Sequence, residues 1–284
     1  WKAIRDGLYS IGVQSHLGDN YPAEITSLDS ILDPDHPTFE GATNPKVLFM
    51  EDFAPVLKSI VDVALGAPEG TLEYEMLTGA FPYVDYILMG SYESPQLMPR
   101  TDEDGNWLPF NQQAWPEDLD RTPAPARKER VYFQMMVPRK EVSSRKDGIP
   151  APVVMVGHGY TGNRFGEAIV YGSHLASLGI ASISIDCVSH GIDVLDEPGE
   201  YDQYYQLLSL FGLGGVIESI GTQGRAVDWD RDGKINSGGD FWTAYLFHTR
   251  DVVRQSAVDY MQLAKIIRSF DGTNTMPYDL DGDG

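Results

Sequence analysis

Alternating aspartates in residues 228–236 form the pattern whose chemistry is plainest in this sequence, and we refer to this segment as the acidic loop. Three carboxylates spaced two residues apart are followed by a glycine and a lysine: Asp228, Asp230, Asp232, Gly233 and Lys234. Calcium takes about six to eight oxygen ligands, and loops that bind it place carboxylates at alternating positions before a glycine turn. The spacing therefore predicts a Ca²⁺ site, for which a solvated acidic turn is the alternative.

The other oxygen ligands of this loop follow the calcium pattern less closely. Lys234 would contribute its main-chain carbonyl oxygen, because its side chain is a cation. The position where a calcium loop usually has glutamate is Gly239, and Asp240 follows one residue later as the candidate that closes the shell. A second acidic run near the end of the sequence begins the same pattern, with Asp279, Asp281 and Asp283 as candidate ligands.

A second stretch with chemical potential is His158-Gly159-Tyr160-Thr161, which follows the apolar run 153–156. Branched apolar residues without alternation predict a strand buried on both faces, as in a parallel sheet. A helical pattern over residues 164–178 comes next, and then a second apolar strand over 180–186. This order predicts a right-handed βαβ unit. Ligands of such sheets bind beyond the carboxyl ends of the strands, where the polar stretch is expected to lie.

This stretch resembles the turn after the third strand of α/β-hydrolases, and the resemblance covers residues 131–270. In that family a His-Gly-aromatic turn supplies a backbone N–H to the oxyanion hole, the set of donors that stabilises the negatively charged intermediate. The resemblance implies that Tyr160 provides this N–H, supported by Thr161. His158 and Gly159 would shape the turn, although a histidine at this place could also act as a base.

The resemblance also implies how the chain is organised. The implied fold is α/β. An N-terminal extension, residues 1–80, would pack on the N-terminal part of an α/β-hydrolase domain, residues 81–284. That domain would have a mostly parallel sheet flanked by helices, with residues 192–240 as a helical cap insertion. The apolar character of this insertion suits an acyl chain, and an ordinary helix packed on the core is the alternative. The candidate substrate contacts in the cap are Tyr204, Leu208 and Phe211.

More narrowly, the sequence looks like large bacterial secreted or surface lipases and esterases. No Gly-x-Ser-x-Gly nucleophile motif occurs in the sequence, so the resemblance implies a Ser/Asp/His triad downstream of residue 284. The expected function is hydrolysis of a small-molecule or lipid ester, with the remainder of the polypeptide as partner. Residues 1–284 alone would be inactive, because no activated nucleophile is present. The alternative is a non-catalytic, calcium-stabilised surface or adhesion protein on a hydrolase-like scaffold.

Composition narrows the classes of partner. The formal net charge is −21, from 42 acidic and 21 basic residues, which disfavours nucleic acid because its phosphates would be repelled. Cys187 is the single cysteine, so an intrachain disulfide is excluded, and we expect it to be a small core residue. No apolar run is long enough to span a bilayer. The sequence begins at Trp1, and we expect that an upstream piece has been removed.

Overall fold

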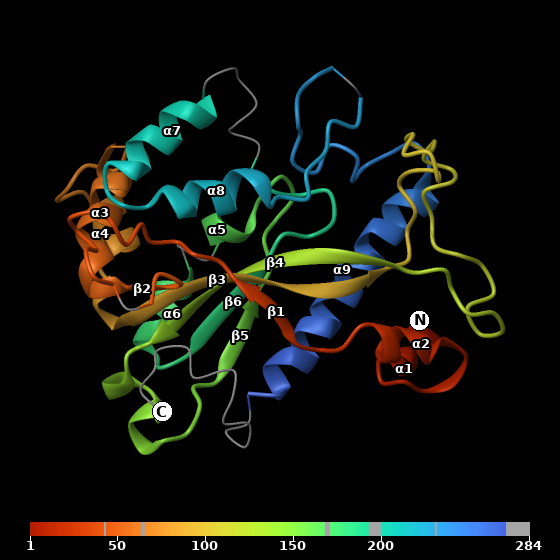
Figure 1. Ribbon diagram of the computed structural model, residues 1–284, viewed down its shortest axis with the longest axis horizontal. Helices are drawn as coiled ribbons and strands as arrows, with labels where there is room; N and C mark the ends of the chain where they lie inside the picture. The colour runs from red at the N-terminus through yellow and green to blue at the C-terminus, as the bar shows by residue number, and fades with distance from the viewer. Residues whose placement is uncertain (43, 64–65, 168–170, 193–199, 231, 271–284) are drawn as a thin grey trace.

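The computed structural model describes residues 1–42, 44–63, 66–167, 171–192, 200–230 and 232–270 (Figure 1). A sheet in the order β1-β3-β4-β6-β5 lies at its centre, and β2 also pairs with β3. The strands are β1 (Ile25–Leu28), β2 (Val47–Phe49), β3 (Val84–Gln96), β4 (Arg127–Pro138), β5 (Val153–Val156) and β6 (Ala181–Ile185).

Helices cover the sheet and continue its connections. The α-helices are α1 (Lys2–Gly7), α2 (His16–Asn20), α3 (Met50–Val63), α4 (Leu72–Thr78), α5 (Arg164–Glu167), α6 (Ser173–Ser177), α7 (Glu200–Ser209), α8 (Gly214–Thr222) and α9 (Leu246–Arg268). Short 3-10 turns are η1 (Gly12–Gln14), η2 (Phe81–Tyr83), η3 (Lys140–Val142) and η4 (Ser144–Asp147). No helix in the described part of the chain is long and apolar enough to cross a membrane.

The fold is mixed α/β, but its sheet is mostly antiparallel over the described residues, which differs from the prediction of a mostly parallel sheet. The pairs β1–β3, β2–β3, β3–β4 and β4–β6 are antiparallel, and β5–β6 is parallel. The long strands β3 and β4 follow one another without a crossover helix, which favours antiparallel pairing. The parallel pair of the predicted βαβ unit is confirmed, with α5 and α6 in its connection.

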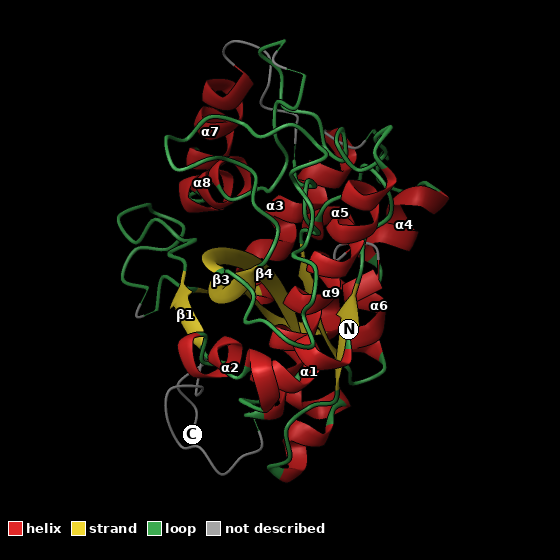
Figure 2. Ribbon diagram, turned by 90° about the vertical axis from the view of Figure 1, so that its right-hand side faces the viewer, coloured by secondary structure: helices red, strands yellow, loops and turns green. Residues whose placement is uncertain are grey.

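Alternating side chains of the strands feed two cores on opposite faces of the sheet. On one face Tyr92, Phe133 and Ile183 pack with Leu263 and Ile266 of α9, and α9 runs diagonally behind the sheet in Figure 1. The other face packs against α3, α6 and α8, and Figure 2 shows α3 and α8 above the strands β3 and β4.

The prediction that both strands of the βαβ unit are buried on both faces is right for β6 and wrong for β5. Every residue of β6 is buried. In β5, Val154 is 38% and Met155 is 42% exposed. The physical reason is position, because β5 is the last strand in the sheet order and has a neighbour on one side within the described residues.

The first 50 residues pack on the rest of the chain and also pair with its strands. Ile4, Leu8 and Leu17 share a buried cluster with Val252 and Val258 of α9. The strands β1 and β2 belong to the same sheet as β3. The predicted N-terminal extension therefore contributes strands to the central sheet as well as packing on it.

Candidate functional site

The His158-Gly159-Tyr160-Thr161 turn follows β5 directly, and the segment after β6 lies beside it. Both ring nitrogens of His158 are engaged there. The backbone N–H of Cys187 donates to its Nε2 at 2.9 Å, and its Nδ1 donates to the Gly159 carbonyl at 2.8 Å. These partners fix the neutral Nδ1–H tautomer and tie the ends of β5 and β6 together. In this arrangement His158 shapes the turn and has no free nitrogen to act as a base.

Two residues without glycine's freedom adopt the left-handed region at these strand ends. Thr161 has φ +62° after β5, and Ser189 has φ +69° after β6. Such conformations cost free energy, and they concentrate at functional sites. The N–H of Gly162 donates to the Gly159 carbonyl at 3.0 Å, which closes the turn. Among the described residues, no acceptor is bound to the main-chain N–H of Tyr160 or Thr161, so the predicted oxyanion donors remain open to a ligand.

Directly beneath this turn lies a buried ion pair between Arg164 and Asp186. The Asp186 carboxylate accepts from the Arg164 backbone N–H at 2.7 Å and from the Arg164 guanidinium. The same guanidinium donates to the Ser219 carbonyl at 3.0 Å. Asp186 is therefore a structural anchor that joins the start of α5 to the end of β6, and its lone pairs are occupied.

A second buried cation, Arg225, continues this network. Its guanidinium donates to Asp259 at 2.8 Å, to Glu129 at 2.9 Å and to the Asp186 carbonyl at 3.1 Å. It thereby links β4, the end of β6 and α9. We refer to Arg164, Asp186, Arg225, Glu129 and Asp259 as the buried charge cluster, which holds the strand ends under the turn in fixed positions.

His190 is a feature of the site that the sequence reasoning did not assign. Its ring centroid lies 4.9 Å from that of His158, 5.3 Å from Phe241 and 6.2 Å from Tyr160. Its Nδ1 donates to the Val188 carbonyl at 2.9 Å. Burial lowers the pKa of His190, and the nearby His158 lowers it further. The signal in the sequence was the Ser189-His190-Gly191 segment directly after the second apolar strand.

Gly238 brings the segment after the acidic loop against this histidine. It has φ +72°, and a Cβ here would lie 2.8 Å from His190 Nε2, so the position requires glycine. The next aromatic residues, Phe241 and Trp242, stand 6.0 Å and 6.4 Å from the Tyr160 ring. The turn after β5 is consequently bordered by aromatic rings that no sequence motif indicated.

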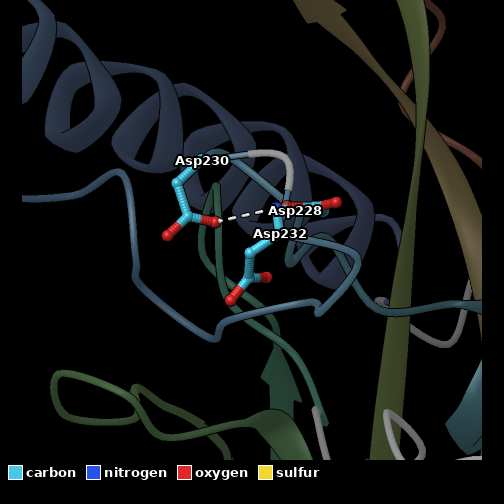
Figure 3. Close-up of side chains that lie close together, drawn as sticks. All are labelled: Asp228, Asp230 and Asp232. Atoms are coloured by element: carbon cyan, nitrogen blue, oxygen red, sulfur yellow. Dashed lines mark hydrogen bonds between the residues drawn. The ribbon is translucent and has the colours of Figure 1, made fainter.

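The three predicted carboxylates of the acidic loop lie close together (Figure 3). One oxygen from each of Asp228, Asp230 and Asp232 lies within 4.8 Å of the others. Main-chain N–H groups of the same loop support them, with Gly233 donating to Asp228 at 3.0 Å and Lys234 donating to Asp232 at 2.9 Å. Three oxygen donors this close together could hold a metal ion, and Gly233 at φ +91° supplies the turn of the loop.

Asp240 lies apart from this carboxylate group in the part of the chain that the structure describes. It is buried, with its carboxylate 3.7 Å from Arg100 and 3.6 Å from His248 Nε2. Burial raises its pKa, but His248, Arg100 and Ser189 outweigh this effect, and the pKa is lowered. Asp240 was expected to close the calcium shell. Its carboxylate instead lies beside Arg100 and His248 in the protein interior.

The residues predicted for a substrate cap occupy different environments. Leu208 is buried in the core cluster that contains Phe39 and Val216, and Phe211 packs against the same cluster. The helices α7 and α8 lie above the sheet in Figure 1, with α7 farther from it. Leu208 and Phe211 therefore act as packing residues here, in line with the alternative of an ordinary helix on the core. The side chain of Tyr204 and the aspartates at 279, 281 and 283 lie outside the described residues.

Comparison with known proteins gives no relative for this chain. No protein-family model matches it, and neither a curated protein nor a solved structure does so.

Proposed function

We propose that this chain is part of a carboxylic ester hydrolase, in which it supplies the oxyanion hole and a calcium loop. The observation that carries the proposal is the turn after β5, where the N–H groups of Tyr160 and Thr161 have no partner among the described residues. Open main-chain donors at a fixed position suit the negative charge that develops on a carbonyl oxygen during acyl transfer. A small-molecule or lipid ester is the proposed substrate.

The surroundings of the turn support this role. The strained φ of Thr161 is held by the His158 hydrogen bonds and by the buried charge cluster. Donors that are fixed before the reaction need no reorganisation when the charge appears, which is the basis of their catalytic effect. The aromatic rings of Tyr160, Phe241 and Trp242 would limit access of water to an ester bound there.

The nucleophile, its histidine and its acid would come from outside these 284 residues in this proposal. A hydrolase-type parallel sheet would be extended at the edge of β5, whose backbone and half-exposed Val154 and Met155 can accept a further strand. Asp228, Asp230, Asp232 and the Lys234 carbonyl would hold Ca²⁺, which would neutralise the converging carboxylates. The expected location is a bacterial cell surface or the secreted fraction.

Hydrolysis of p-nitrophenyl esters tests this function. We expect the full gene product to turn over these esters and to lose activity with a serine-directed reagent, whereas residues 1–284 alone are inactive. Reagent-sensitive turnover by residues 1–284, or a full gene product without a Gly-x-Ser-x-Gly motif, would contradict the proposal. A full product that binds calcium and has no esterase activity would favour the second candidate, a calcium-stabilised surface or adhesion protein. The observation that supports this candidate is the acidic loop.

A further inference from the structure

A cavity of about 340 Å³ opens beside the acidic loop. Its lining combines aromatic rings with an amide and a carboxylate: Trp107, Phe110, Trp229, Gln113 and Asp230. The β3–β4 connection contributes Trp107, Phe110 and Gln113. The acidic loop contributes Trp229 and Asp230. Its volume lies in the range of small-molecule sites.

The aromatic walls of this cavity are held by packing. Phe110 packs on His248 in a tilted arrangement with ring centroids 4.7 Å apart, and its ring stands 6.3 Å from that of Trp229. His248 is itself fixed, because its Nδ1 donates to the Gln113 carbonyl at 3.0 Å. Trp229 is 40% exposed, so part of its π-face is available to a ligand.

The electrostatics of the cavity favour a cation. The Arg100 guanidinium carbon already lies 5.9 Å from the Trp107 ring centroid, so one of these rings receives a positive charge within the protein. The charge of Arg100 is itself matched by Asp240 at 3.7 Å. Asp230 adds a carboxylate to the rim, with Asp228 and Asp232 close by. The chain as a whole carries a net charge of −21.

We propose that this cavity binds an organic cation of the quaternary-ammonium class. Such a cation interacts with the negative faces of aromatic rings, and a nearby carboxylate attracts it further. A purely apolar ligand would leave the carboxylates unused, and an inorganic ion would leave the rings unused.

Choline is the probe for this site, and its neutral carbon isostere 3,3-dimethylbutan-1-ol is the matched control ligand. Both have the same shape, so their difference isolates the positive charge. We expect choline to bind at least tenfold more tightly than the isostere in isothermal titration of the protein in chelator-containing buffer. Equal affinities, or no saturable choline binding, would overturn the proposal.

Variants of Trp229 test the contribution of the ring. We expect Trp229→Leu to weaken choline binding at least tenfold and Trp229→Phe to keep most of it, because phenylalanine retains a π-face. Trp242→Leu removes an indole that is 66% exposed and lies outside the cavity, and it should leave binding unchanged. If Trp229→Leu binds choline as tightly as the unmodified protein, or if Trp242→Leu loses as much, the cavity is not the site.

A calcium titration separates this site from the calcium loop. Ca²⁺ at the acidic loop would neutralise its carboxylates, so choline affinity should fall severalfold without being abolished. Phe110→Leu should weaken choline binding and leave calcium binding intact. Complete mutual exclusion of choline and Ca²⁺ would show that both need the same carboxylates, and the aromatic cavity would not be a separate site.

Discussion

Two regions of this protein differ in the partners of their carboxylates. In the buried charge cluster, Asp186 meets Arg164, and Asp259 and Glu129 meet Arg225. In the acidic loop, the carboxylates of Asp228 and Asp232 accept hydrogen bonds from main-chain N–H groups of the loop itself. The carboxylates of Asp186 and Asp259 are closed within the protein, whereas those of the acidic loop lie close together at the surface with excess negative charge.

This difference separates positioning from binding. A buried carboxylate that is paired on every side cannot accept a further ligand without large rearrangement, so it fixes the elements around it. Converging surface carboxylates repel one another, and an added cation relieves that repulsion. The turn after β5 combines fixed surroundings with open N–H donors.

The largest effect is expected from Asp186→Ala, which leaves the Arg164 guanidinium buried without its carboxylate. Removing one partner of a buried pair typically costs about 3–5 kcal/mol of unfolding free energy. Urea unfolding of the two proteins measures this loss. Glu93→Ala removes one partner of the exposed Lys128 pair and serves as the control, with a change too small to resolve. Similar losses for both variants would mean that the cluster does not act as an anchor.

The second prediction concerns the main-chain donor at Tyr160, and it applies to the esterase activity of the full gene product. Tyr160→Pro removes the N–H, and loss of one oxyanion donor lowers turnover by about 10²–10³. Tyr160→Phe keeps the N–H and should keep most of the activity, since the side chain is 55% exposed.

Circular dichroism must first show that Tyr160→Pro is folded, because proline could distort the turn. A folded proline variant with near-normal turnover, beside an inactive Tyr160→Phe, would contradict the backbone assignment. The phenol would then be the catalytic group.

The third prediction addresses the acidic loop. Calcium that binds only the folded state stabilises it by mass action, by about 2.7 kcal/mol at a hundredfold excess over the dissociation constant. We expect chelation to lower the melting temperature, and Asp230→Ala to remove most of that difference. Asp104→Ala, in the separate exposed Asp102–Asn106 turn, is the matched control. Identical melting curves with calcium and with chelator would exclude the site.

Local patterns explain what could be predicted from the sequence. The parallel pair of β5 and β6 rests on two apolar runs with a helical segment between them, and the convergence of Asp228, Asp230 and Asp232 rests on their spacing. The turn after β5 follows from glycines at a strand end. Each of these features is encoded within a few dozen residues.

The rest depends on contacts that are distant in the sequence. Arg225 meets Glu129 across 96 positions, and no spacing rule connects them. The sheet is mostly antiparallel because β1 and β2 of the N-terminal segment pair with β3. We had predicted that this segment would only pack on the core. Asp240 fitted the spacing of a late calcium ligand, yet its carboxylate lies beside the buried side chains of Arg100 and His248.

The smallest effect is expected at His190, whose ring lies beside those of His158 and Phe241 at the turn after β5. Burial lowers its pKa in the folded protein from the ordinary value of 6.5. As pH falls through about 6.5, the unfolded chain therefore takes up a proton at this residue before the folded chain does. Proton binding then favours the unfolded state, so this histidine reduces stability as pH falls below its unfolded pKa.

His190→Gln removes the titrating group, and the variant should lose less stability than the unmodified protein between pH 7.5 and pH 5.5. Urea midpoints at several pH values across this range measure the difference. The difference between the two proteins should change with pH and level off below the folded pKa of His190. Parallel curves would mean that His190 binds its proton equally well in both states. The packing around Gly238 and Phe241 would then not disfavour a charged His190, and a charge at the turn would be as well solvated as one in the acidic loop.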